Sequence, residues 1–344
     1  VKFFANMNIS KIYCIIPSII QIIIYYVINI YLYYMIRRDY IYKIKHFIKK
    51  YGKAIVIIIT IITVLRILST NNLENCYIDF IDVGQGDATL IVTNTNKKIL
   101  IDGGGSEFNS DFDVGKNTLL PHLLKKKINK LDYVIISHFD SDHVGGILTI
   151  LNELKVEKVI IGKQFETSQN YEEFIKIMEK KKIKLYVVEA GQKIKVDKDT
   201  TIDILWPDTS NIIKENILNN NSLVCKLNFK DKSMLCTGDI EEIAEKAILS
   251  KYSDNLNILN ADIIKIAHHG SRTSSITPFI NRVRPKIALI GVGKNNKFGH
   301  PNFKTIENLE KMGVKIFRTD ENGEIQIKIT NRSEIITKVH LKSR

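Results

Sequence analysis

Residues 132–146 constrain the fold of this chain more than any other stretch; their sequence is Asp-Tyr-Val-Ile-Ile-Ser-His-Phe-Asp-Ser-Asp-His-Val-Gly-Gly. The apolar, largely β-branched run at 133–136 predicts a short buried strand. Two imidazoles and two carboxylates follow it at once, and a helical pattern begins after Gly145 and Gly146. We therefore expect a ligand-rich loop at the C-terminal end of a strand, where open α/β sheets place their binding sites.

The four polar side chains of this loop are His138, Asp140, Asp142 and His143. Imidazole and carboxylate groups are ligands of Zn, Mn and Fe. In an extended loop the first three would point the same way and the fourth elsewhere, so that one loop can supply two adjacent metal positions. The alternative is a solvated loop in which Asp142 caps the next helix. Four ligand-type residues within six positions favour the metal site.

Further histidines and aspartates, which could also bind metal, stand beside glycines at other expected strand ends. Instead of binding metal, the aspartates could hold turns or cap helices, and the last histidine could lie in an ordinary surface loop. The residues are Asp87 in the turn 84–87, Asp102 before Gly103, Asp239 after Gly238, the adjacent His268 and His269 before Gly270, and His300 between Gly299 and Pro301.

The pattern His-x-Asp-x-Asp-His after an apolar strand resembles the second motif of the metallo-β-lactamase superfamily, with Asp140 where most members have His. Together with 82–88, 237–239 and 268–271, it resembles the C-terminal domain of the ComEC family of DNA-uptake competence proteins. The resemblance spans about residues 77–330 and implies an αββα sandwich. The alternation of expected strands and helices between 158 and 206 separately favours an α/β layered fold.

The resemblance implies two divalent metal ions held by six residues. No histidine lies between His143 and His268, so the usual third-motif ligand is missing, and Asn221 and Ser222 stand in its place. An oxygen-rich first site favours Mn²⁺ or weakly held Zn²⁺. The implied ligands are His138, Asp140 and bridging Asp239 for the first ion, and Asp142, His143, His268 and Asp239 for the second.

The resemblance also implies roles for residues around the ions. Asp102 would orient the ligands, and Asp87 would hold a turn or face the site. Catalytic roles would fall to Asp142, which orients the attacking hydroxide, and to His269 and His300, which face the leaving oxygen. The residues expected to contact a phosphate are Ser271, Arg272 and Thr273.

The N-terminal region predicts a membrane anchor. Residues 12–36 carry no charge and are long enough to span a bilayer, which needs roughly 20 apolar residues. A second apolar run covers 54–68 if Arg66 snorkels, and the segment between the runs is basic. The positive-inside rule would then place the rest of the chain outside the cytoplasm. We expect an anchor and linker over 1–76, a hydrolase domain over 77–330 and a frayed basic tail over 331–344.

Composition limits the partners. The formal net charge of +13 makes nucleic acid or an anionic lipid surface plausible, although basic membrane flanks and a Lys-rich bias explain part of it. The four cysteines form no Cys-x-x-Cys pair, so no zinc finger is implied. We expect them to be buried, and a Cys225–Cys236 bridge stays open if the domain is extracytoplasmic.

The leading expectation is a membrane-anchored metal-dependent hydrolase of phosphodiesters, most of all DNA. Two alternatives remain open at this point. One is a metallo-hydrolase of a lactam, small phosphoester or cell-wall component. The other is a non-catalytic module that binds DNA and passes it to a separate channel. ComEC-type proteins carry a multi-helix channel domain, and with one or two spans this chain is expected to be a truncated or split member.

Overall fold

The computed structural model describes the chain except for residues 1–18, 38–40, 70–73, 106–111, 256 and 341–344. It contains two compact units, one of residues 1–72 with 124–128, the other of 73–123 with 129–344. The first unit holds the helices α2 (Ile19–Arg37) and α3 (Ile41–Ser69). In the described part of the chain, neither helix combines the length and apolar content that a bilayer crossing requires. The anchor stays a prediction, and part of the expected span 12–36 lies outside the described residues.

Two β-sheets form the second unit. The larger sheet has eight strands in the order β15-β14-β1-β2-β3-β4-β5-β6, and the smaller has seven in the order β13-β12-β11-β10-β9-β8-β7. The larger sheet is built from β1 (Cys76–Phe80), β2 (Thr89–Val92), β3 (Lys98–Ile101), β4 (Lys130–Ile136), β5 (Lys155–Gly162), β6 (Lys184–Val188), β14 (Glu324–Ile329) and β15 (Ile335–His340). The smaller is built from β7 (Lys193–Lys195), β8 (Thr200–Trp206), β9 (Val224–Phe229), β10 (Lys232–Cys236), β11 (Ile263–Lys265), β12 (Ile287–Ile290) and β13 (Lys315–Arg318).

Both sheets contain a parallel half. Strands β3, β4, β5 and β6 run parallel in the larger sheet, as do β10, β11, β12 and β13 in the smaller. Because parallel strands end on the same side, the loops after β3, β4, β10 and β11 open toward one rim. These loops carry the polar residues singled out in the sequence.

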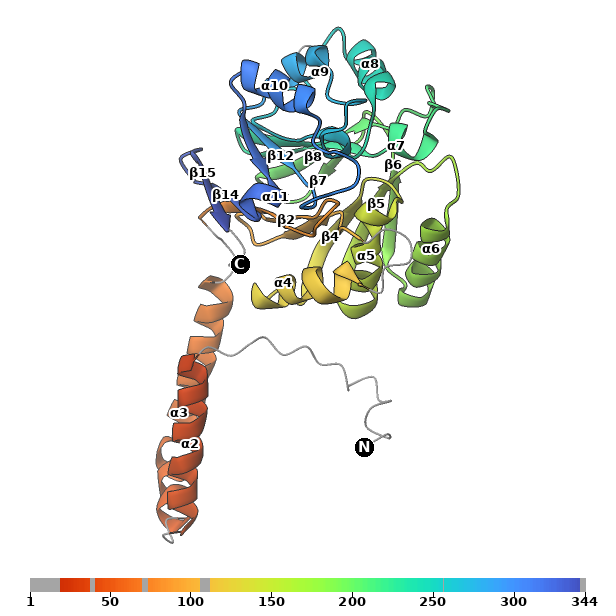
Figure 1. Cartoon of the computed structure of the whole chain (residues 1–344). Helices are drawn as coiled ribbons and strands as arrows, with labels where there is room; N and C mark the ends of the chain where they lie inside the picture. The colour runs from red at the N-terminus through yellow and green to blue at the C-terminus, as the bar shows by residue number, and fades with distance from the viewer. Residues whose placement is uncertain (1–18, 38–40, 70–73, 106–111, 256, 341–344) are drawn as a thin grey trace. The chain divides into compact units, whose positions relative to one another are not determined.

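The core lies between the sheets, and a helical layer covers each outer face (Figure 1). Inward side chains such as Ile78, Ile135, Leu227 and Ile263 are fully buried or nearly so. Burying a side chain of this size contributes about 1.5–3 kcal/mol, which makes this layer the main source of stability. The helices are α4 (Leu120–Lys125), α5 (Ser141–Glu153), α6 (Gln169–Lys181), α7 (Ile217–Asn220), α8 (Glu242–Lys251), α9 (Thr277–Val283), α10 (Phe303–Lys311) and α11 (Thr319–Asn322). The expected αββα architecture is confirmed.

One detail differs from expectation. Residues 335–340 are not part of a frayed tail, because they pair with β14 as the antiparallel edge strand β15.

The expected burial of Cys225 and Cys236 is confirmed. They lie directly opposite each other on β9 and β10, and both are free thiols buried in the core.

Candidate metal centre

Asp102 fixes the orientation of His143. It follows β3, and its Oδ2 accepts hydrogen bonds from His143 Nδ1 at 2.9 Å and Ser137 Oγ at 2.8 Å. Its Oδ1 accepts from the Ser137 backbone N–H at 2.8 Å. With Nδ1 donating to Asp102, Nε2 is the nitrogen of His143 that can bind a metal ion once its proton is displaced. The contact is compatible with the orienting role that the resemblance implies for Asp102, which stays a prediction.

Three further side chains converge in front of His143. The Nε2 atoms of His143 and His269 lie 3.3 Å apart. Asp142 Oδ2 lies 3.1 Å from Nε2 of His269, and Asp239 places Oδ1 at 3.1 Å from His143 Nε2 and Oδ2 at 3.3 Å from His269 Nε2. Tetrahedral ligands about 2.0 Å from an ion are about 3.3 Å from one another, so these four separations suit donors that share a Zn²⁺-sized ion. We call His143, His269, Asp142 and Asp239 the four-residue cradle.

Local backbone geometry brings these groups together. Helix α5 begins at Ser141, so Asp142 and His143 lie in its first turn and not in the extended loop expected from the sequence. The carboxylate of Asp142 is also favoured there by the helix dipole. Gly86 lets this turn approach closely, since a Cβ on it would lie 2.2 Å from the Asp142 carbonyl oxygen.

The charges of the cradle are strongly coupled. Burial alone would lower the pKa of both histidines and raise that of both carboxylates. Their mutual attraction is stronger, so the pKa of His143 stays well above its usual value and that of His269 rises to about 10. The pKa values of Asp142 and Asp239 are lowered correspondingly. Opposite charges therefore stabilise this cluster before any ion enters.

Lys265 and Asp87 complete the wall of the cradle. Lys265 is 4% exposed, and its Nζ lies 3.0 Å from Asp239 Oδ1, donates to the Gly238 carbonyl at 2.8 Å and contacts Asp87 Oδ2. One donor atom each from Asp87, His143, Asp239 and His269 lie within 4.8 Å of one another. Of the two roles considered for Asp87, holding a turn or facing the site, the side chain has the position required for the second.

The expected first metal position is less complete. His138 Nε2 lies 3.6 Å from Asp140 Oδ2, and the His138 ring centre lies 4.2 Å from that of His143. Among the described residues Nε2 has no hydrogen-bond partner, although His138 is only 1% exposed. Such an orphaned buried nitrogen fits a ligand position. The side chain of Asp140, by contrast, is 42% exposed.

The structure places His269, and not His268, in the cradle. We expected His268 at the second ion, but His269 is the residue whose Nε2 enters the cradle. Both residues adopt left-handed backbone angles, with φ of 50° and 52°. This turn directs His269 inward, where its Nδ1 donates to the Gly291 carbonyl at 2.7 Å. His268 instead faces Glu241, with Nδ1 3.6 Å from Oε1.

The expected phosphate-contacting residues lie on the His268 side. Ser271 is buried, and its hydroxyl is hydrogen-bonded to the hydroxyl of Thr273. The Thr273 hydroxyl donates to Glu241 Oε1 at 3.0 Å. Arg272 is exposed. The His300 ring lies 5.8 Å from that of His268 and stacks on Phe298 at 5.7 Å. The structure therefore groups these residues beside the cradle, not in it.

An open groove of about 660 Å³ reaches the metal centre. Asp142, which belongs to the cradle, lines it together with Asp140, and Phe298 lies at its edge with 55% of its surface exposed. Its other lining residues are Gln85, Gly105, Phe139, Ser141, Ser168, Gln169, Asn170 and Leu218. A ligand in this groove would lie against Asp140 and Asp142, one residue from each expected metal position.

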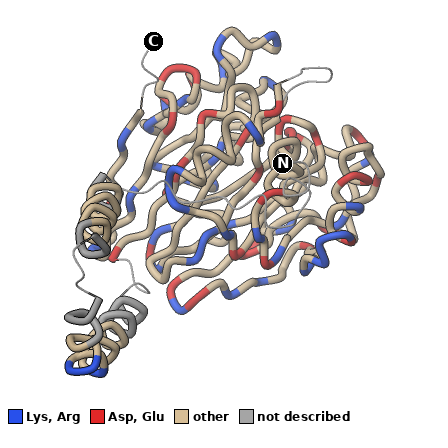
Figure 2. Tube along the Cα trace, turned by 90° about the horizontal axis from the view of Figure 1, so that it is seen from below, with Lys and Arg blue, Asp and Glu red and all other residues tan. Residues whose placement is uncertain are grey.

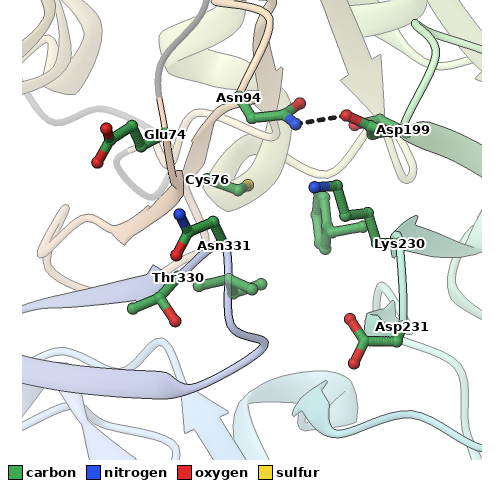
Figure 3. A pocket seen from close by; sticks show the side chains of 11 residues that line it. Glu74, Cys76, Asn94, Asp199, Lys230, Asp231, Thr330 and Asn331 are labelled. Carbon is green, nitrogen blue, oxygen red and sulfur yellow. Dashed lines mark hydrogen bonds between the residues drawn. The ribbon is translucent and has the colours of Figure 1, made fainter.

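A second, smaller hollow lies elsewhere in the domain (Figure 3). There Asn94 donates to Asp199 at 2.6 Å, beside Lys230 and Asp231. None of the residues singled out above for catalysis or metal binding lines it. The groove at the cradle is therefore the candidate for substrate binding.

Lys265 is a residue of the site that the sequence motifs do not single out. A lysine flanked by Ile263, Ile264, Ile266 and Ala267 is unusual, because lysines are almost never fully buried unless they are paired. That signal, three residues before the first histidine of the pair at 268–269, could have identified it.

Comparison with known proteins agrees with the fold. The family model described as "Metallo-beta-lactamase superfamily" matches residues 81–294. The chain belongs to the metallo-beta-lactamase superfamily.

Its relatives narrow the assignment to the ComEC type that the motifs indicated. The chain is 31% identical over 265 residues to ComE operon protein 3 of Bacillus subtilis, covering 74% of this chain and 33% of that protein. It is 29% identical to Recombination protein 2 of Haemophilus influenzae, covering 73% and 28%. It is 27% identical to Competence protein ComA of Neisseria gonorrhoeae, covering 71% and 31%. The chain thus spans about a third of the length of these curated relatives.

Proposed function

We propose that this chain is a metal-dependent phosphodiesterase that cleaves DNA during competence-type DNA uptake. The observation that carries the proposal is the position of the four-residue cradle at an open groove, with Asp142 common to both. Nε2 of His138, which has no hydrogen-bond partner in the described part of the chain, provides a second ligand position beside it. Manganese or zinc would suit these imidazole and carboxylate donors.

The chemistry follows from the groups that face the groove. A divalent ion in the cradle would lower the pKa of a water molecule and stabilise negative charge on the phosphate. Asp142 is placed to orient that water, because its carboxylate faces both the cradle and the groove. Gln85 and Asn170 offer amide groups that can position the substrate.

His300 suits a hydrogen-bonding role. Burial and the positive charge of His269 and His268 lower the pKa of His300 to about 4. The ring is then neutral near pH 7, so it donates a hydrogen bond to the leaving oxygen rather than a proton.

DNA as the substrate is supported by three features. Residues 73–344 carry a net charge of +4, because residues 1–72, with ten Lys and Arg and one Asp, supply +9 of the +13 of the chain. Figure 2 shows Lys and Arg distributed along the domain among acidic residues, which suits contacts that do not read sequence. Phe298 offers an exposed ring at the groove on which a base can stack. Two of the relatives named above are competence or recombination proteins.

The N-terminal helices indicate where in the cell the protein would act. Side chains such as Ile23, Tyr25 and Val27 on α2 are more than half exposed, so this apolar surface lacks a partner among the described residues. We propose that it anchors the chain to a membrane, with the hydrolase domain outside the cytoplasm, beside a separate channel that carries the DNA.

The test is DNA cleavage by the full chain with Mn²⁺. We expect cleavage of labelled single- or double-stranded DNA that is lost in His143→Ala and Asp239→Asn and retained in Asp231→Asn, a matched change at the other hollow. DNA binding without cleavage by metal-loaded protein would support the non-catalytic module instead. Cleavage of small chromogenic phosphoesters or lactams but not DNA would support the alternative substrate class.

A further inference from the structure

We propose that the Lys265 side chain is a built-in cation that takes the place of a metal ion between Asp87 and Asp239, so that the cradle itself requires only one bound divalent ion. The inference concerns the metal centre and does not rest on DNA being the substrate. It goes beyond the ligand set of the superfamily resemblance, in which this lysine has no assigned role.

The contacts of Lys265 are those of a bound cation. Its Nζ has three oxygen neighbours: Oδ1 of Asp239, Oδ2 of Asp87 and the carbonyl oxygen of Gly238. All three residues are buried, and the lysine side chain is 5% exposed. A buried charge is costly unless it is paired and hydrogen-bonded, and here both conditions are met.

The position of Nζ excludes a mobile ion from the same place. Asp87 and Asp239 both belong to the group of donors that lie within 4.8 Å of one another. The ammonium already contacts one oxygen atom of each of these two carboxylates, Oδ2 of Asp87 and Oδ1 of Asp239. The donors that remain for a mobile ion are His143, His269 and Asp142, with Asp239 shared.

One divalent ion is enough to balance the charges. An ion displaces the protons of His143 and His269, because a histidine binds metal in its neutral form. Lys265 and the ion then balance the three carboxylates that face the cradle, those of Asp87, Asp142 and Asp239. Gly238 allows this arrangement, because it has φ of 55° and a Cβ on it would lie 2.7 Å from Ser222 Cβ. A further ion would then have to bind at His138 and Asp140, outside the volume that Lys265 occupies.

Replacing Lys265 by methionine tests the proposal, because methionine keeps the length of the side chain and removes its charge. Asp87 and Asp239 would be left uncompensated, and an added ion would relieve their repulsion. We expect the melting temperature of metal-free Lys265→Met to fall by roughly 5 °C or more. We also expect saturating Mn²⁺ to raise the melting temperature of this variant by more than it raises that of the wild type.

The matched control is Lys226→Met. Lys226 is also a buried lysine of the smaller sheet, on β9, and it donates to the Ile258 carbonyl, away from the cradle. Its variant is expected to melt lower, with a Mn²⁺-induced rise equal to that of the wild type. A Mn²⁺-induced rise in Lys265→Met equal to or smaller than that of the wild type would overturn the proposal.

A second variant covers the case in which Lys265→Met does not fold. Asp87→Asn leaves Lys265 with excess positive charge, so Mn²⁺ should bind more weakly and raise the melting temperature less than in the wild type. The double variant Lys265→Met/Asp87→Asn restores the balance and should return the rise toward the wild-type value. An unchanged rise in Asp87→Asn, or a double variant that responds less than Asp87→Asn alone, would contradict the assignment.

Discussion

His143 and Asp102 are joined by a 2.9 Å hydrogen bond between Nδ1 and Oδ2, although 41 residues separate them in the chain. The bond directs Nε2 of His143 into the cradle. Replacing Asp102 by Asn should leave Nδ1 without its strong acceptor and permit the opposite tautomer. We expect Mn²⁺ affinity to fall about 10- to 100-fold in a calorimetric titration.

Asp132→Asn is the control for this change. Asp132 is also a buried aspartate of the larger sheet, but it accepts from Lys97 Nζ at 2.9 Å and takes no part in the cradle. Its variant should bind Mn²⁺ as the wild type does. Equal affinities in both variants would show that Asp102 does not orient a ligand.

The position of His269 in the cradle, where His268 was expected, gives a second prediction. Asn tolerates left-handed backbone angles better than Ala does, so Asn is the suitable replacement at both positions. His269→Asn should reduce the metal content of the purified protein several-fold, measured by elemental analysis. His268→Asn should retain it, because His268 faces Glu241. The reverse pattern would restore the assignment made from the sequence.

Much of this centre could be predicted from the sequence, because clustered His and Asp residues directly after a buried strand are typical of metal sites. The ligand-rich loop at 138–143 follows from local patterns, whereas the two-sheet fold and the convergence of His143, Asp142 and Asp239 are implied by the resemblance to the ComEC family. The direction of His269 could not be predicted, because it depends on two consecutive left-handed residues. The start of α5 at Ser141 and the ion pairs of Lys265 depend on tertiary packing.

Glu245 gives a prediction about pH. It lies on α8, is fully buried, and accepts backbone hydrogen bonds from Ser275 and Ile276 at 2.6 and 2.8 Å. Burial outweighs these bonds and raises its pKa to about 8. Between the usual pKa of about 4.5 and this value, the folded protein holds a proton that the unfolded chain has lost, so stability decreases as pH rises.

The measurement is the free energy of unfolding in denaturant at pH 5 and pH 8. From pH 5 to pH 8 the free energy of unfolding of the wild type should fall by a few kcal/mol because Glu245 ionises. The free energy of unfolding of Glu245→Gln, which cannot ionise at this position, should fall by less. Glu242→Gln on the exposed face of the same helix serves as the control. A pH dependence unaltered by Glu245→Gln would show that the buried carboxyl does not titrate in this range.

Membrane anchoring is tested on the full chain expressed in bacteria. We expect it to remain with the membrane fraction after alkaline carbonate extraction, because α2 presents an apolar surface. A reporter fused after Arg344 should be active only in the extracytoplasmic compartment. Recovery in the soluble fraction would contradict the anchor, and a reporter active in the cytoplasm would contradict the orientation.

The central claim is that side chains from separate loops hold a divalent ion at one rim of the sandwich. The most direct measurement is an anomalous-scattering map from crystals of the protein grown with Mn²⁺. A peak about 2.0–2.3 Å from the Nε2 atoms of His143 and His269 and from carboxylate oxygens of Asp142 and Asp239 is the predicted result. The absence of a peak at saturating Mn²⁺, or a peak bound by His268 in place of His269, would contradict the account.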